Sequence, residues 1–178
     1  MNKVFGKISD FSPVREDGSR VIISYGYEAV DEENATWLEV YLYRKQQAIV
    51  TLDVVKQAII GDINARTDEK ILSGFVWGQK PVWLSQENQF NFKAAYDVAV
   101  QTEGQSLPVK FKLGEQEDGT PVYHTFTSLS AFTDFYTQAI AYIQQQLTAG
   151  WQEKDAIDWS PYEALFPASE TESGTITE

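Results

Sequence analysis

Alternating apolar and polar positions predict two β-strands near the start of the chain. Residues 21–30 (VIISYGYEAV) and 37–44 (WLEVYLYR) are rich in β-branched and aromatic side chains, and the polar segment DEEN lies between them. Alternate side chains of a strand share a face. The first strand is therefore expected to group Val21, Ile23, Tyr25 and Tyr27 on one face. The second is expected to group Trp37, Glu39, Tyr41 and Tyr43, opposite Leu38, Val40 and Leu42.

Both faces of this predicted hairpin are largely apolar or aromatic, and an isolated hairpin cannot bury both of them. Either the rest of the chain or a second copy of it must cover the surplus, and the sequence favours neither. An exposed strand edge also offers unpaired N–H and C=O groups to another strand. The candidate protein-interface residues are the aromatic side chains of the two strands: Tyr25, Tyr27, Trp37, Tyr41 and Tyr43.

Apolar residues at helical spacing predict a first helix over residues 52–65. Thr51 is a suitable N-cap, and Asp53 lies in the first turn, where the helix dipole favours an anion. Gly61 weakens the second half of this helix. The apolar stripe consists of Leu52, Val55, Ile59 and Ile63.

Two further helices are expected later in the chain. Ser85 is the predicted N-cap of a helix over residues 86–101. Ser128 or Ser130 is expected to begin the longest helix, which ends near Leu147, with Gly150 as its stop. The long helix carries an apolar stripe of Leu129, Phe132, Tyr136, Ala139, Ile143 and Leu147.

Turn residues predict two β-hairpins between the helices. Residues 71–84 (ILSGFVWGQKPVWL) place a Gly-Gln-Lys-Pro turn between two short runs rich in β-branched and aromatic residues. Residues 107–113 and 121–127 flank the segment GEQEDG, in which Asp118-Gly119 supplies the turn. The expected fold class is α+β. We expect an N-terminal β module for docking and oligomerisation at 1–47, a mixed domain of three helices and two β-hairpins at 48–166, and a disordered acidic tail at 167–178.

Composition narrows the classes of function. Apolar residues make up 43% of the 178 residues and aromatic residues 13%, which is typical of a globular chain. No run of about 18 apolar residues is present, so no membrane partner is expected. The start of the chain also lacks the apolar core of a signal peptide. The net charge of −12 repels phosphate backbones, so we expect no nucleic-acid partner.

Residues able to carry out catalysis are few. The chain has no cysteine and one histidine, His124, which lies in the strand-like segment VYHTF and is expected to be structural. Asp155 and Asp158 are interpreted as solvated turn residues rather than a catalytic pair. The acidic runs DEEN and EQED lack the ligand spacing of a calcium loop. We therefore expect no enzyme activity, no cofactor and no metal site.

Tryptophan supplies the main alternative function. Trp77, Trp83, Trp151 and Trp159 could form a platform for sugar rings, because aromatic faces offer broad apolar contact. Tryptophans beside a hairpin turn and a helix end more often pack a core, and we predict this role for Trp77 and Trp83. The alternative function is a carbohydrate-binding module that recognises a bacterial surface glycan.

The order of motifs from residue 52 to about residue 158 resembles a domain of unknown function found in phage tail-fibre and related tail proteins. The matching motifs are the helix LDVVKQAIIGDINA, the hairpin ILSGFVWGQKPVWLS, the helix start QENQFNFKAAYDVA, the hairpin LPVKFKLGEQEDGTPVYHTF, and the long helix with GWQEKDAI. In that family a lysine closes the last helical segment, as Lys154 does here. The aromatic strands at the start of the chain lie outside the resemblance.

The resemblance implies a non-enzymatic virion component in the tail, the baseplate or a fibre. Such a protein would act through assembly contacts with other virion or tail proteins, and we expect it to be a homo-oligomer. Its expected location is the virion, which assembles in the cytoplasm of the bacterial host. No catalytic residue of the family is available to transfer to this chain.

Overall fold

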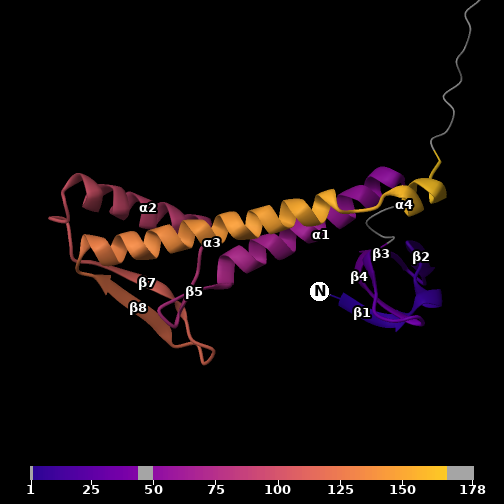
Figure 1. The fold of residues 1–178 in the computed structure, drawn as a ribbon, viewed down its shortest axis with the longest axis horizontal. Helices are drawn as coiled ribbons and strands as arrows, with labels where there is room; N and C mark the ends of the chain where they lie inside the picture. The colour runs from indigo at the N-terminus through magenta and orange to yellow at the C-terminus, as the bar shows by residue number, and fades with distance from the viewer. Residues whose placement is uncertain (1, 44–49, 168–178) are drawn as a thin grey trace, which may run out of the picture. The chain divides into compact units, whose positions relative to one another are not determined.

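The computed structural model describes residues 2–43 and 50–167, and it shows an α+β fold, as predicted (Figure 1). The chain divides into two compact units. The terminal unit consists of Met1–Asp62 and Lys154–Glu178, and the central unit consists of Ile63–Glu153. The predicted module boundary at residue 47 and the predicted disordered tail beyond Pro167 lie outside the described residues. Among the helices of the described ranges, none is both long enough and apolar enough to cross a membrane.

The terminal unit contains an antiparallel sheet with the strand order β1-β4-β3-β2. The predicted hairpin is its centre. The chain itself pairs both edges of that hairpin, because β1 lies beside β4 and β2 lies beside β3. The strands are β1 (Asn2–Lys7), β2 (Val14–Asp17), β3 (Arg20–Ala29) and β4 (Asn34–Tyr43), and the 3-10 turn η1 (Ile8–Asp10) follows β1.

Strand β3 is buried on both faces over residues 21–25. A β-bulge then interrupts its pairing with β4 between Tyr25 and Glu28. Gly26 adopts φ 64° there, a conformation that glycine reaches without steric cost. The extra residue moves Tyr27 to the face opposite that of Tyr25. The prediction that Tyr27 shares a face with Val21, Ile23 and Tyr25 is therefore wrong.

Register defines the two faces of this sheet. The Trp37 face carries Ile22 and Ser24 of β3 beside Trp37, Glu39 and Tyr41 of β4. The opposite Tyr25 face carries Val21, Ile23 and Tyr25 beside Leu38, Val40 and Leu42. On the Trp37 face the ring of Phe11 lies 5.0 Å from that of Tyr27 and 5.8 Å from that of Trp37, measured between centroids.

Two helical segments complete the terminal unit. Helix α1 (Leu52–Ser73) begins at the predicted cap, where the Thr51 hydroxyl accepts a hydrogen bond from the Val54 amide at 3.4 Å. Its first residues belong to this unit, and the Tyr25 hydroxyl donates to Asp62 at 2.6 Å. The short helix α4 (Ser160–Leu165) was not predicted. Its Tyr162 donates a hydrogen bond to the Ser24 carbonyl at 2.6 Å.

The central unit packs its helices and hairpins around an aromatic core. Phe126, Phe132 and Phe135 are fully buried, and Phe92 is 2% exposed. Helices α2 and α3 are in contact, since Tyr96 stacks on Tyr136 with a centroid distance of 4.5 Å (Figure 1). The elements are the rest of α1, then β5 (Phe75–Trp77), β6 (Lys80–Val82), α2 (Gln86–Gln101), β7 (Val109–Glu115), β8 (Pro121–Phe126) and α3 (Leu129–Asp155).

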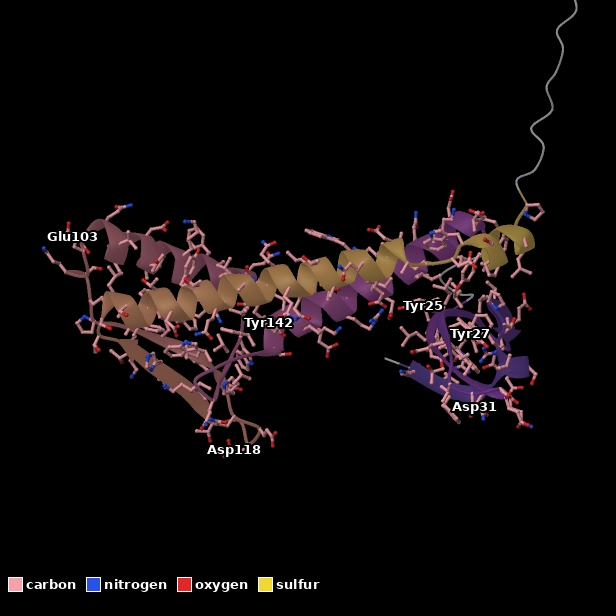
Figure 2. All side chains as sticks on the ribbon, in the orientation of Figure 1. Tyr25, Tyr27, Asp31, Glu103, Asp118 and Tyr142 are labelled. Carbon is pink, nitrogen blue, oxygen red and sulfur yellow. The ribbon has the colours of Figure 1, made fainter. Side chains whose placement is uncertain are left out.

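Both predicted hairpins of the mixed domain form, although the first is shorter than expected. Residues 71–73 end helix α1 instead of beginning a strand. The Trp83 amide donates to the Leu113 carbonyl at 2.7 Å and so links β6 to β7. Asp118 lies in the turn between β7 and β8 (Figure 2).

Two glycines predicted to weaken or stop helices lie inside them. Helix α1 continues past Gly61 because Ile59 and Ile63 on its buried stripe are fully buried. Burial of two isoleucines outweighs the cost of a helical glycine, which is about 1 kcal/mol. Gly150 is buried within α3, and a Cβ atom there would lie 2.6 Å from Thr67 Oγ1. Gly150 therefore allows α1 and α3 to approach closely and does not stop the helix.

Alanine at these two glycines is expected to change stability in opposite directions. Gly61→Ala should stabilise the protein by about 0.5–1 kcal/mol, because a Cβ at Gly61 meets no atom within 4 Å. Gly150→Ala should destabilise it by about 1–3 kcal/mol, because Thr67 Oγ1 is held by its hydrogen bond to the Ile63 carbonyl. Urea unfolding followed by circular dichroism measures both changes. Stabilisation by both variants would contradict the close helix contact.

Candidate functional site

A buried carboxylate lies on the Trp37 face of the terminal-unit sheet. The Glu39 side chain is 4% exposed, and Arg15 Nη2 lies 2.9 Å from its Oε1. Trp37 Nε1 donates to Oε1 at 3.0 Å, and the Tyr41 hydroxyl donates to Oε2 at 3.0 Å. We call these four residues the Glu39 cluster: Arg15, Trp37, Glu39 and Tyr41. Arg15 also donates to the hydroxyl of the buried Ser24 at 3.4 Å.

Two opposing effects set the ionisation of Glu39. Burial alone would raise its pKa, but the hydrogen bonds from Trp37, Arg15 and Tyr41, together with the Arg15 charge, lower the pKa below its ordinary value. The carboxylate therefore stays ionised at neutral pH. Burial, and then the hydrogen bond to Glu39, raise the pKa of Tyr41, so its hydroxyl stays protonated as a donor.

The geometry of the Glu39 cluster indicates a structural role. Both carboxylate oxygens accept hydrogen bonds from the protein, and a pKa below the ordinary value disfavours proton transfer near neutral pH. Sequence analysis placed Glu39 on an aromatic face without assigning it a role. The one acidic residue on the otherwise aromatic face of WLEVYLY was the feature of the sequence that could have indicated a buried, hydrogen-bonded carboxylate.

The five predicted interface residues have different environments. Tyr25 is 2% exposed and Trp37 is 3% exposed, so both are core residues of this chain rather than docking residues. Tyr41 is half-buried and bonded to Glu39. Tyr27 and Tyr43 are exposed and remain predicted interface residues; Figure 2 labels Tyr25 and Tyr27 in the sheet. The strand pattern identified the aromatic residues, but it did not show which of them the chain covers.

His124 packs in the central unit as a neutral side chain. Its Nδ1 lies 2.9 Å from Lys80 Nζ, and its ring lies 4.9 Å from that of Trp77. Burial, and then the Lys80 charge, lower the pKa of His124 below its ordinary value of 6.5. The nearby Asp134 accepts a hydrogen bond from Trp77 Nε1 at 3.0 Å. A cationic neighbour makes His124 a poor general base, in agreement with the structural role predicted for it.

The pKa of His124 is expected to rise when Lys80 is replaced by methionine. This change removes the positive charge that disfavours imidazolium but keeps a long apolar side chain. Because His124 is the one histidine of the chain, a proton NMR titration gives a single imidazole signal. Lys93→Met, on the exposed face of α2, is the matched control and should leave the titration unchanged. A pKa that does not rise in the Lys80 variant would contradict this account.

The tryptophans also occupy different environments. Trp77 packs its ring against Phe126 and Phe135, with centroid distances of 5.5 and 5.3 Å, as expected of a core residue. Trp83 is half-buried, and Lys112 Nζ lies 5.3 Å from its ring centroid. Trp159 is half-buried beside Tyr162, and Trp151 is 52% exposed on α3. Trp77 and Trp83 are both half-buried, and Trp77 packs against the aromatic core as predicted, although part of each side chain is open to solvent.

The remaining candidate carboxylates lie near the end of α3. Asp158 accepts hydrogen bonds from the Ser160 amide at 3.0 Å and from its hydroxyl at 2.7 Å, and so stabilises the start of α4. These hydrogen bonds lower the pKa of Asp158. Within the described ranges, no group of three or more Asp, Glu, His or Cys side chains is arranged to hold a metal ion.

Comparison with known proteins assigns the family. The sequence matches the family described as a domain of unknown function, DUF4376, over residues 54–172, which is more than half of the chain. The chain belongs to the DUF4376 family. No curated protein and no solved structure matches it significantly. The DUF4376 match covers α2, α3 and the hairpins of the central unit, whereas β1–β4 and the Glu39 cluster precede it.

Proposed function

We propose that this DUF4376 protein is a structural component of a phage virion, in the tail, the baseplate or a fibre, that acts through protein–protein contacts. The proposal is supported by the order of motifs that resembles phage tail proteins. The structural observation that carries it is the exposure of aromatic side chains on a sheet whose core is otherwise well buried. Phe5, Tyr27 and Tyr43 are 64%, 42% and 51% exposed.

The mode of contact follows from the edges of the terminal-unit sheet. Edge strand β1 carries Lys3 and Lys7, and edge strand β2 carries the charged run 15–17. Charged residues on edge strands oppose pairing with further strands. We therefore expect docking through side chains on the sheet faces rather than through addition of a strand. Tyr43 lies on the Trp37 face by its pairing with Arg20, and the bulge places Tyr27 on the same face.

A double substitution tests this proposal. Tyr27→Ser with Tyr43→Ser should reduce the oligomer measured by light scattering and lower the amount of the chain in purified phage particles, because aromatic anchors dominate most protein interfaces. Tyr123→Ser, at an exposed tyrosine of the central unit, is the matched control. Immunoblotting of density-purified particles measures incorporation. A wild-type chain that is monomeric and absent from the particles would refute the proposal.

A further inference from the structure

The outward face of hairpin β7–β8 carries lysines alternating with aromatic rings. The register pairs Val109 with Phe126 and Phe111 with His124, and these side chains point toward the core of the central unit. The alternate pairs therefore point outward. They are Lys110 with Thr125 and Lys112 with Tyr123.

Each of these lysines lies over an aromatic ring. Lys110 Nζ is 4.7 Å from the ring centroid of Tyr123, and Lys112 Nζ is 5.3 Å from that of Trp83. The hydrogen bond from the Trp83 amide to the Leu113 carbonyl holds Trp83 beside β7, and Gly114 lets the Pro81 backbone approach there, since a Cβ would lie 2.8 Å from the Pro81 oxygen. We call the set the lysine–aromatic face: Trp83, Lys110, Lys112, Tyr123 and Thr125.

The charge of this face is opposite to that of the chain. The chain carries −12, yet this face presents two ammonium groups beside two rings. Lys112 pairs with Glu115 at 2.6 Å, whereas Lys110 has no ion pair among the residues that the structure describes. Tyr123 is 54% exposed. The face therefore combines accessible aromatic surface with one uncompensated positive charge, and it complements an anionic ligand with flat apolar groups.

We propose that the lysine–aromatic face binds an acidic polysaccharide. The apolar faces of its sugar rings would stack on Tyr123 and Trp83, and its carboxylates would pair with Lys110 and Lys112. A carboxylated polysaccharide alternates flat rings with negative charges, as this face alternates rings with ammonium groups. Two lysines on a chain of charge −12 are a poor match for the dense charge of nucleic acid. This binding activity goes beyond the assembly role and does not depend on it.

Binding by the purified full chain tests the inference directly. Isothermal titration with alginate, a carboxylated polysaccharide, should show binding that weakens as salt is added, because the ion pairs are screened. Neutral dextran should bind much more weakly, since it offers rings without charges. Poly-L-glutamate tests whether the carboxylates of an acidic polypeptide bind as well as those of a polysaccharide. If it binds as tightly as alginate, the face recognises acidic polypeptide and the proposal is wrong.

Variants locate the site. Lys110→Gln and Tyr123→Ser should each weaken alginate binding by about fivefold, while Glu115→Gln should strengthen it by removing a repelling charge. Lys93→Gln, at an exposed lysine of α2 paired with Asp97, should leave binding unchanged. Unchanged melting temperatures confirm that the folds are comparable. Absence of alginate binding at low salt, or equal loss in the Lys93 control, would overturn the proposal.

Discussion

Replacing Phe135 by alanine is expected to destabilise the central unit by about 3–5 kcal/mol. Phe135 is fully buried, and its ring lies 5.1 Å from the rings of Phe92 and Phe126 and 5.3 Å from that of Trp77, measured between centroids. Removing it leaves a cavity where α2, α3 and both hairpins meet, and close packing of rings prevents the surroundings from filling it. Urea unfolding followed by circular dichroism measures the loss.

The control for this experiment is Phe90→Ala on helix α2. Phe90 is 72% exposed, so its truncation should change the free energy of unfolding by about 0.5 kcal/mol or less. Hydrogen exchange locates the effect, and increased exchange should be concentrated between residues 63 and 153. A loss for Phe135→Ala no larger than that for Phe90→Ala would show that the aromatic core does not hold the central unit together.

Replacing Glu39 by alanine is expected to destabilise the terminal unit by about 1–3 kcal/mol. The change leaves the nearly buried Trp37 without an acceptor for its Nε1 and removes the partner of Arg15. A buried donor left without an acceptor loses its water without compensation. Asp97→Ala, which breaks an exposed pair with Lys93, is the control and should cost about 0–1 kcal/mol. Comparable losses for the two variants would contradict the structural role of the cluster.

The stabilisation by Glu39 should also depend on pH in one direction. Its folded-state pKa is lower than the ordinary value of 4.5, so the folded protein holds the carboxylate proton less tightly than the unfolded chain does. The contribution of ionisation is therefore present above pH 4.5 and is lost as the pH falls through the folded-state pKa. In urea unfolding at decreasing pH, wild type should lose more stability than Glu39→Gln. A parallel decline would rule out this source of stability.

Local sequence patterns predicted the elements of the fold better than their ends. The caps at Thr51 and Ser85 and the stripe through Ile59 and Ile63 depend on neighbouring residues, and the structure confirms them. Gly150, which was predicted to stop the helix, instead lies inside α3 against Thr67, a residue distant in sequence. Tertiary packing therefore overrode the local helix-stop signal.

The candidate sites were less predictable because they depend on register and on distant partners. A single inserted residue at the Gly26 bulge moves Tyr27 to the other face, and alternation cannot reveal such an insertion. The Glu39 cluster requires Arg15 from an edge strand that the pattern did not predict. For the lysine–aromatic face, the alternation of apolar residues with Lys110 and Lys112 along β7 predicts that the two lysines share an outward face. Its Trp83 comes from another hairpin, through the linkage of β6 to β7.

The hydrogen bond from Tyr162 to the Ser24 carbonyl joins residues 138 positions apart and has a consequence for synthesis. Translation proceeds from the N-terminus, so a ribosome releases the whole of the central unit before it releases Tyr162. The central unit is one continuous segment, so it can fold while the terminal unit still lacks α4. The Ser24 carbonyl of the sheet cannot accept the hydrogen bond from Tyr162 until α4 has left the ribosome. During that interval the charged residues of edge strands β1 and β2 oppose pairing with strands of other chains.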